Sequence, residues 1–308
     1  MKIGFMCATA NNGVCTIDEI IDEVRAGEAM GFDQAWMAQV FSTDAISMMT
    51  LLGRETTRIA LGTAVTPSYP RHPTALALQV LTASAASGGR FALGLGLSHK
   101  LVIEDMFGLA YRKPARHMQE YLEVLMPLLR GEACAFRGEE FRVNARFNVP
   151  DAPPAPVLVA ALGPRMLEIA GRLADGTITW MTGPRALATH TLPLIRQAAA
   201  AAGRPAPRVV ASFPIALTAA PEQARARLAR SVEAYGQLPS YRRMLDIEGA
   251  SHPADIAMLG DEAALRTQLE HLRSLGVTDF NGFCVAVEDG AAARTKAFLA
   301  SEKAALAA

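Results

Sequence analysis

"RIALGTAV", residues 58–65, and "RFALGLGL", residues 90–97, are the two stretches that decide the fold. After its leading arginine, each is a short run of apolar and small residues in which apolar and polar positions do not alternate. Strands that are apolar on both faces are typical of a parallel sheet that is covered on both sides. A loop and then a helical pattern follow each run, so both stretches predict strands of an α/β fold.

The same strand–loop–helix unit recurs along the chain. The predicted strands cover residues 2–7, 34–38, 58–65, 91–97, 157–162, 177–181, 209–218 and 277–287. Eight such units in 308 residues predict a TIM (β/α)8 barrel that forms one domain over residues 1–308. The alternative is a doubly wound open sheet. Its G-x-G-x-x-G fingerprint is incomplete here, because "GLG" at 94–96 continues as "LSH" without a third glycine.

Two insertions interrupt the regular spacing of the units. Residues 98–156 follow the fourth strand and contain a helix at 114–130 and a hairpin around Arg137 and Gly138. Residues 219–260 follow the seventh strand and include "YGQLPSYRRML". In a TIM barrel both insertions begin on the face where active sites form, so we expect them to be walls or lids of a pocket. The alternative is that they pack on the outside of the barrel.

The composition restricts the partners. Thirty basic residues balance thirty acidic ones without a block of like charge, which argues against nucleic acid and favours a small-molecule partner. No run approaches about 18 apolar residues, so no membrane span is expected. The four cysteines form no CxxC pair and fit a reducing compartment, so we expect a cytoplasmic protein.

Few residues suggest chemistry performed by side chains alone. The six histidines form no HxxxH or HxH pattern, so no metal site is predicted. A G-x-S-x-G elbow and a Cys/His dyad are also missing from the sequence. We therefore expect a cofactor to supply the reactive group.

"ALGPRM", residues 161–166, joins the fifth strand to the next helix. Proline at the first helical position loses no hydrogen bond, whereas the N–H groups of Gly163, Arg165 and Met166 stay free and the helix dipole favours an anion. The Arg165 side chain adds a cation, so the segment predicts a phosphate site. The alternative is a helix start whose donors bind water. A second Gly-Pro-Arg, at 183–185, opens the next helix on the same face.

Further candidates lie at other strand ends. The small residues at 62–64 leave room for a flat ring against the backbone. Ser98 is a candidate phosphate ligand, and His99 a donor of a hydrogen bond or a proton, although a solvated loop histidine is the alternative. Trp180 ends the sixth strand and is expected either to line the pocket or to belong to the core.

The chain resembles the luciferase-like monooxygenase superfamily, in particular its deazaflavin-dependent oxidoreductase branch. The segments that carry the resemblance are "GFDQAWMAQVFSTDAIS", "RIALGTAVTPSYPRHPTALALQ", "GGRFALGLGLSH", "ALGPRMLEIAGRLADGTITWMTGPR" and "GDEAALRTQLEHLRSLGVTDF". The resemblance implies a TIM barrel that binds coenzyme F420, or FMN in sister branches, at its C-terminal face. It also implies a homodimer.

The resemblance also implies positions for the coenzyme. The ring lies against the end of the third strand, here Thr63 to Val65, beside a non-prolyl cis peptide at about Ala64-Val65. The phosphate contacts fall on two loops and comprise Gly96, Ser98, His99, Ala161, Leu162, Gly163, Pro164, Arg165 and Met166. Many relatives carry an Asp-His or Glu-His pair at the end of the second strand, but this chain has Gln39-Val40. Gln39 is still able to hydrogen-bond the ring, and His99 becomes the candidate catalytic polar group.

Together these observations predict an F420-dependent oxidoreductase that transfers a hydride between the deazaflavin and a small organic substrate. The alternatives are an FMN-dependent monooxygenase of the same family and a non-catalytic F420-binding protein. The missing histidine at position 40 weakens the assignment to the sugar-phosphate dehydrogenases of the family.

Overall fold

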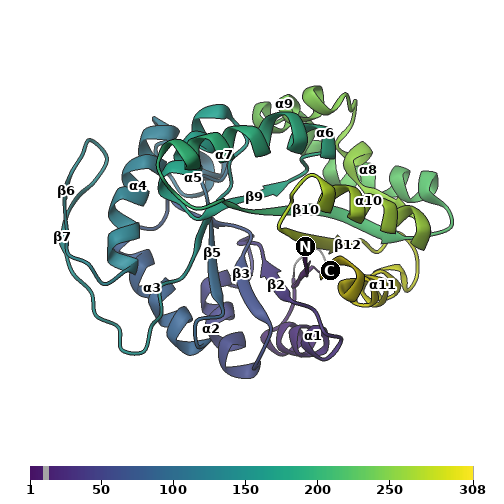
Figure 1. The fold of residues 1–308 in the computed structure, drawn as a ribbon, viewed down its shortest axis with the longest axis horizontal. Coiled ribbons are helices and arrows are strands. Elements are labelled where there is room, and N and C mark those ends of the chain that lie inside the picture. The colour runs from purple at the N-terminus through teal and green to yellow at the C-terminus, as the bar shows by residue number, and fades with distance from the viewer. Residues whose placement is uncertain (10–13, 308) are drawn as a thin grey trace.

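The computed structural model describes residues 1–9 and 14–307 and contains a closed barrel of parallel strands surrounded by helices (Figure 1). The barrel strands are β1 (Lys2–Met6), β2 (Gln34–Met37), β3 (Ala60–Thr63), β5 (Phe91–Gly96), β8 (Val157–Val159), β9 (Gly176–Trp180), β10 (Arg208–Leu217) and β12 (Asp279–Cys284). Each strand pairs in parallel with the next, and β12 pairs with β1 to close the ring. The predicted TIM barrel is confirmed, and the open-sheet alternative is wrong.

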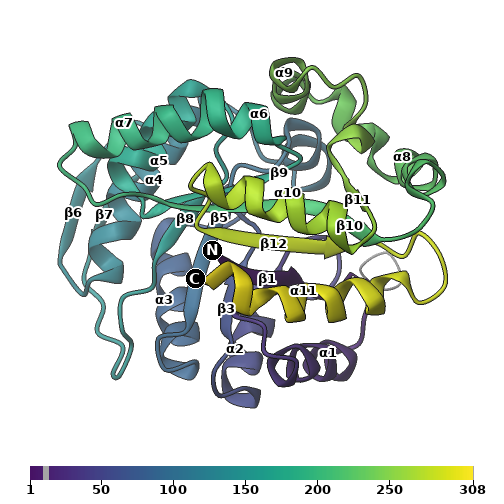
Figure 2. The same ribbon diagram turned by 45° about the vertical axis from the view of Figure 1, so that its right-hand side comes forward.

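Helices cover the outside of the barrel. They are α1 (Ile17–Ala29), α2 (Ala45–Glu55), α3 (Pro73–Ala86), α5 (Pro164–Leu173), α6 (Pro184–Ala186), α7 (Leu192–Ala201), α10 (Glu262–Ser274) and α11 (Ala291–Ala307). Asp44 caps α2 by accepting a hydrogen bond from Ser47 N, and His72 caps α3, whose first residue is proline. Figure 2 shows α11 beside β1, with the two chain ends close together. Within the described residues, no helix has the length and apolar content that a membrane span needs.

Both predicted insertions are present. The first contains a short π-helix (Val102–Met106), α4 (Pro114–Leu129) and an antiparallel hairpin of β6 (Cys134–Arg137) and β7 (Arg142–Ala145). The second contains α8 (Pro221–Gln237), α9 (Pro239–Glu248), a 3-10 helix (Pro253–Ile256) and β11 (Met258–Gly260), which extends the sheet beside β10. The hairpin and the α8–α9 pair stand on opposite sides of the barrel (Figures 1 and 2).

The main differences from the predicted elements occur at prolines and strand ends. The helix expected at 184–202 is divided into α6, a π-helix (Leu187–Thr191) and α7, because Pro193 has no N–H to donate within a continuous helix. Pro239 ends α8 and begins α9, a helix that the sequence analysis did not predict. β8 ends at Val159 instead of residue 162, and β4 (Thr66–Pro67) is an additional short strand paired with β5.

The interior of the barrel contains an apolar layer and, nearer the amino ends of the strands, a charged cluster of Arg208, Asp279 and Gln34. The apolar layer contains Met6, Trp36, Ala92, Leu158, Ile178 and Val210. In the charged cluster, Arg208 donates from Nε and Nη2 to the Asp279 carboxylate, at 3.0 and 2.8 Å, and Gln34 donates to the same carboxylate. Burial acts to raise the pKa of Asp279, but the hydrogen bonds and the charge of Arg208 outweigh it and hold that pKa below its ordinary value. The charged cluster thus links β2, β10 and β12 through side-chain hydrogen bonds.

Replacing Arg208 with methionine is expected to lower the free energy of unfolding by about 3–5 kcal/mol, because the Asp279 carboxylate stays buried without its cation. Urea denaturation at pH 7 measures this loss, and adding Asp279→Leu is expected to restore most of it. A carboxyl group whose pKa is lowered by folding stabilises the protein above its unfolded pKa of about 3.9 and loses that effect as the pH falls further. The advantage of the wild type should therefore decrease below about pH 4. A loss under about 1 kcal/mol in the single variant contradicts the assignment.

Candidate functional site

A cavity of about 1210 Å³ opens at the carboxyl ends of the barrel strands. This volume exceeds the range of about 300–1,000 Å³ that is usual for one small ligand, so it has room for a coenzyme and a substrate together. Met6 and Ile178 of the apolar layer also line the cavity, together with Ser212 of β10. The π-helix after β5 and the helices α8 and α9 contribute wall residues, so parts of both insertions line the pocket as expected. The helix α4 instead packs between α3 and α5 on the outside of the barrel, which was the alternative.

The structure brings most of the predicted site residues to this cavity. Those that line it are Gln39, Ala64, Val65, Gly96, Ser98, His99, Ala161, Leu162, Gly163, Met166 and Trp180. Thr63, Pro164 and Arg165 are not among the lining residues. The Arg165 guanidinium lies 2.6 Å from Glu168 Oε2 and 3.3 Å from Gln119 Oε1. The side chain of Arg165 therefore adds no cation to the cavity. Only its backbone N–H remains as a predicted phosphate contact.

The end of β3 forms a bulge that packs closely against two glycines of β5. The Ala64–Val65 peptide is cis, as the resemblance implied. Thr63 Oγ1 donates to the carbonyl of Gly94 at 2.8 Å and accepts from the Gly94 N–H at 3.0 Å. A Cβ atom on Gly94 would lie 1.9 Å from the Thr63 carbonyl oxygen, and one on Gly96 would lie 2.6 Å from Val65 Cγ2. Thr63 thus positions the bulge from behind, while Ala64 and Val65 form the cavity wall.

The two Gly-Pro-Arg segments have different surroundings. At the start of α6, the Glu248 carboxylate of α9 accepts a hydrogen bond from Ala186 N at 2.8 Å and lies close to Gly183. At the start of α5, Gly163 faces the cavity, and a Cβ atom on it would meet nothing within 4 Å. Among the described residues, no carboxylate accepts a hydrogen bond from the first turn of α5 as Glu248 does at α6. The free N–H groups of α5 therefore face the cavity and can receive an anionic group.

His190 supports this loop, which the sequence analysis did not anticipate. Its Nε2 atom lies 2.8 Å from the carbonyl oxygen of Leu162, within hydrogen-bond distance. His190 belongs to the π-helix that follows α6, so its contact depends on the break in the expected helix 184–202. The loop before α5 is thus held from the neighbouring βα unit.

Gln39 and His99 differ in how free their side chains are. Gln39 Oε1 accepts a hydrogen bond from Ala45 N at 2.8 Å, so its carbonyl is used to cap α2. His99 is half-buried at the cavity wall, with its ring centroid 6.1 Å from that of Tyr241. Burial lowers the pKa of His99 below its ordinary value, which keeps the imidazole neutral at pH 7. Ser98, directly before it, has a φ of +60°, an uncommon conformation for serine that is often found at functional sites.

An aromatic wall, made of Trp180, Tyr235, Tyr241 and Phe283, lines the part of the cavity that β9, β12, α8 and α9 form. The ring centroids of Trp180 and Phe283 are 5.6 Å apart, those of Trp180 and Tyr235 are 6.2 Å apart, and those of Tyr235 and Tyr241 are 5.1 Å apart. All three pairs meet edge to face, a favourable arrangement for aromatic rings. The sequence analysis named only Trp180 of this wall, because the break at Pro239 that turns Tyr235 and Tyr241 inward was not predicted.

Charged groups are scarce in the cavity. Arg71 is the single arginine among the described lining residues, which include no lysine and no carboxylate, and its guanidinium pairs with Asp44. No cluster of three or more potential metal ligands occurs in residues 1–9 and 14–307. The chemistry of the site therefore depends on neutral polar groups and on whatever molecule fills the cavity.

The chain belongs to the luciferase-like monooxygenase family, whose model matches residues 1–298. It is 32% identical to a 5,10-methylenetetrahydromethanopterin reductase from Archaeoglobus fulgidus, over 53% of this chain and 49% of the relative. It is also 30% identical to a putative coenzyme F420-dependent oxidoreductase from Mycobacterium tuberculosis, over 53% of this chain and 51% of the relative. The chain thus matches about half the length of these two proteins.

Solved structures show the same fold. An F420-dependent secondary alcohol dehydrogenase in complex with an F420-acetone adduct superimposes with a TM-score of 0.81 at 16% identity, covering 100% of this chain and 99% of that chain. These comparisons show the family and the fold of the chain, and the proteins that it is similar to include F420-dependent oxidoreductases.

Replacing Gly94 with alanine is expected to destabilise the protein by about 1–3 kcal/mol or more, because the new Cβ atom overlaps the Thr63 carbonyl. Gly163→Ser is the control, since its side chain enters open space and serine caps helices well. Thermal and urea denaturation compare the two variants. Equal stability of Gly94→Ala and the wild type would show that the close contact between β3 and β5 is not needed.

His99 is expected to titrate below pH 6.5, because burial disfavours its charged form. The chemical shift of its Cε1 proton, followed by NMR from pH 4 to 8, measures the midpoint. His99→Gln removes the signal and confirms the assignment. A midpoint above 6.5 would mean that an anionic partner, and not burial, dominates the environment of His99.

Proposed function

We propose that this protein is a coenzyme F420-dependent oxidoreductase that transfers a hydride between the deazaflavin and a small organic substrate. The observation that carries the proposal is the free N-terminus of α5, which opens on the cavity at Gly163. At the equivalent segment that begins with Gly183, the Glu248 carboxylate accepts a hydrogen bond from the first turn of α6. An anionic group that belongs to a bound molecule suits these donors. The family match and the F420-dependent relatives support the choice of coenzyme.

The residues on the β3, β5 and β8 side of the cavity fit such a coenzyme. The backbone N–H groups of Arg165 and Met166 and the hydroxyl of Ser98 are suited to its phosphate, and the bulge at Ala64 and Val65 offers a flat apolar surface to its ring. When bound, the deazaflavin supplies the carbon that donates or accepts the hydride. The chain orients that ring, excludes water with its two insertions, and holds His99 neutral as a hydrogen-bond donor near the reacting atoms.

Other features of the molecule carry over from the sequence as part of the same proposal. The chain acts as one domain, in the cytoplasm, as a homodimer, with the coenzyme and a small molecule as its partners. FMN is the alternative coenzyme, because the donors at α5 recognise a phosphate and not the ring chemistry.

Gly163→Asp is expected to weaken F420 binding at least tenfold, which corresponds to about 1.4 kcal/mol. The new carboxylate caps α5 from within, as Glu248 does at α6, and repels the phosphate of the coenzyme. Because aspartate is a good helix cap, the thermal midpoint should stay the same or rise. The fluorescence of F420 reports binding, and FMN is titrated in parallel.

Two further variants separate charge from shape. Gly163→Asn has the same size without the charge and should give an intermediate loss of affinity. Arg165→Gln should change the affinity less than about threefold, because its guanidinium already pairs with Glu168 outside the cavity. Wild-type protein that binds neither F420 nor FMN would refute the proposed function, whereas FMN binding alone would favour the monooxygenase alternative. Tight F420 binding without hydride transfer to any of a broad panel of enones and imines would indicate a non-catalytic binding protein.

A further inference from the structure

We propose that the substrate is a neutral, ring-containing carbonyl compound, such as an aromatic or polycyclic ketone or enone, which packs on the aromatic wall. This proposal rests on the proposed function, because it assigns the β3, β5 and β8 side of the cavity to the coenzyme. It names the chemical class of the molecule that occupies the remaining side.

The two sides of the cavity offer different contacts. The anion-compatible donors, at Ser98 and at the start of α5, lie with the β3 bulge on the coenzyme side. The opposite side is built by β9, β10, β12, α8 and α9 and presents mainly aromatic and aliphatic groups, including Leu228 and Val232 beside the aromatic wall. The Tyr241 end of this side lies beside His99, with ring centroids 6.1 Å apart, and the described lining residues on this side include no charged group.

The aromatic wall favours a flat apolar molecule. Its rings contact one another edge to face and form a continuous surface that comes from four different elements. Burying a flat ring system against such a surface removes apolar area from water and adds favourable ring contacts. Because neighbouring rings of the wall pack on each other, they form a surface and do not surround a central point as a cage for a cation would.

The scarcity of charge excludes ionic substrates on energetic grounds. A charged group that is buried without a partner costs several kcal/mol. Arg71, the one arginine among the described lining residues, is already neutralised by Asp44. An anionic or cationic substituent would therefore be desolvated in this cavity without compensation.

Neutral donors are available for one carbonyl oxygen. Ser212 Oγ accepts a hydrogen bond from Asn281 Nδ2 at 3.0 Å, so the hydroxyl hydrogen of Ser212 stays available for donation. Burial raises the pKa of Tyr241, which keeps its phenol protonated and able to donate. A ketone oxygen matches these donors, whereas a hydrocarbon would leave them without an acceptor.

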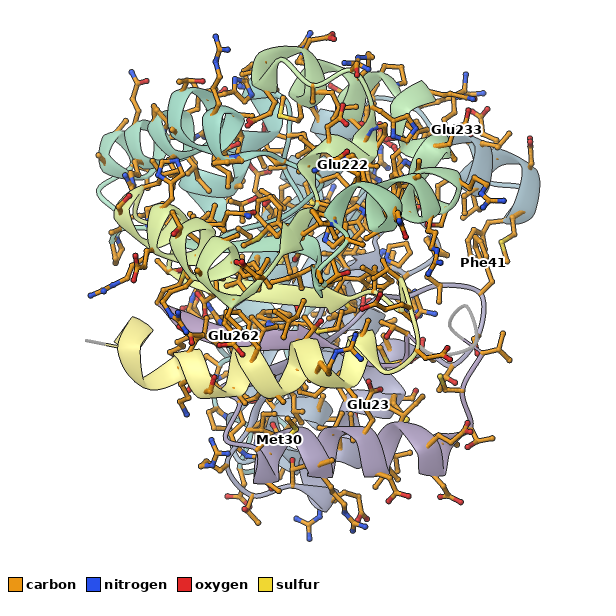
Figure 3. All side chains as sticks on the ribbon, turned by 90° about the vertical axis from the view of Figure 1, so that its right-hand side faces the viewer. Glu23, Met30, Phe41, Glu222, Glu233 and Glu262 are labelled. Atoms are coloured by element: carbon orange, nitrogen blue, oxygen red, sulfur yellow. The ribbon has the colours of Figure 1, made fainter. Side chains whose placement is uncertain are left out.

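The mouth of the cavity is also apolar. Val40, Phe41 and Met106 line the cavity and are 45%, 71% and 55% exposed, although their side chains are large and hydrophobic. Figure 3 shows the Phe41 side chain projecting from its loop at the edge of the molecule. Clustered exposed apolar groups at the rim of a pocket are typical of a surface that meets an apolar ligand.

Three ligands that share one ring system and one ketone test the charge preference. They are 2-acetylnaphthalene, its 6-carboxylate and its 6-trimethylammonium derivative, each titrated by calorimetry into the protein with and without bound F420. The neutral ketone is expected to bind at least tenfold more tightly than either ion. Equal or tighter binding of the anion or the cation, or binding of none of the three to the F420-loaded protein, would overturn the proposal. Absence of F420 binding would instead show failure of the proposed function, so the two failures are distinguishable.

A charge placed in the aromatic side of the cavity provides a second test. Ser231→Lys adds a cation at an exposed lining residue of α8 and is expected to raise the affinity for the carboxylate derivative about threefold. Glu233→Lys, on the same helix, is the matched control, because residue 233 is likewise exposed but is not among the lining residues (Figure 3). This control should leave the affinities of all three ligands unchanged. If Ser231→Lys does not change the preference for the anion, or if the control changes it equally, the ligands bind outside the assigned side.

Discussion

The contact between Thr63 and Gly94 is the constraint on which the shape of the site depends. The Thr63 side chain bonds both the N–H and the carbonyl of Gly94, and thereby replaces ladder hydrogen bonds where β3 leaves β5. Because Gly94 has no side chain, the Thr63 carbonyl can approach its backbone closely. Gly96 leaves space for the Val65 side chain in the same way. The bulge that faces the cavity is therefore determined by two glycines in a neighbouring strand.

The Gly-Pro-Arg segments show how a local motif depends on its tertiary surroundings. Both place proline at the first helical position and leave backbone donors free. At α6 a carboxylate from α9 takes those donors, so that segment serves to attach the second insertion to the barrel. At α5 the same donors open on the cavity. The two helix ends are alike, and the difference is that Glu248 accepts a hydrogen bond at α6 whereas the donors of α5 stay open to the cavity.

The fold was predictable because its signals are local. Buried parallel strands, caps such as Asp44 and prolines at helix starts each act within a few residues, and the barrel follows from repeating them. The site was predictable only in part, because its other contacts join distant segments. Gly62 is one example: it makes space for the Trp36 ring inside the barrel and not for a ligand, since a Cβ atom there would lie 2.3 Å from that ring. The inward position of Tyr241 likewise depends on how α8 and α9 fold back, which periodicity does not reveal.

The neutrality of the cavity has a consequence for how such a site would accelerate a reaction. With His99 uncharged and the phenol of Tyr241 protonated at pH 7, few groups are available to exchange protons with a substrate. Hydride transfer requires close approach of two carbon atoms and exclusion of water more than it requires a strong acid or base. A rigid bulge on one side, an aromatic wall on the other and two insertions over the opening provide that geometry. In a site of this kind, the distance and angle between a bound coenzyme and its substrate would determine the rate.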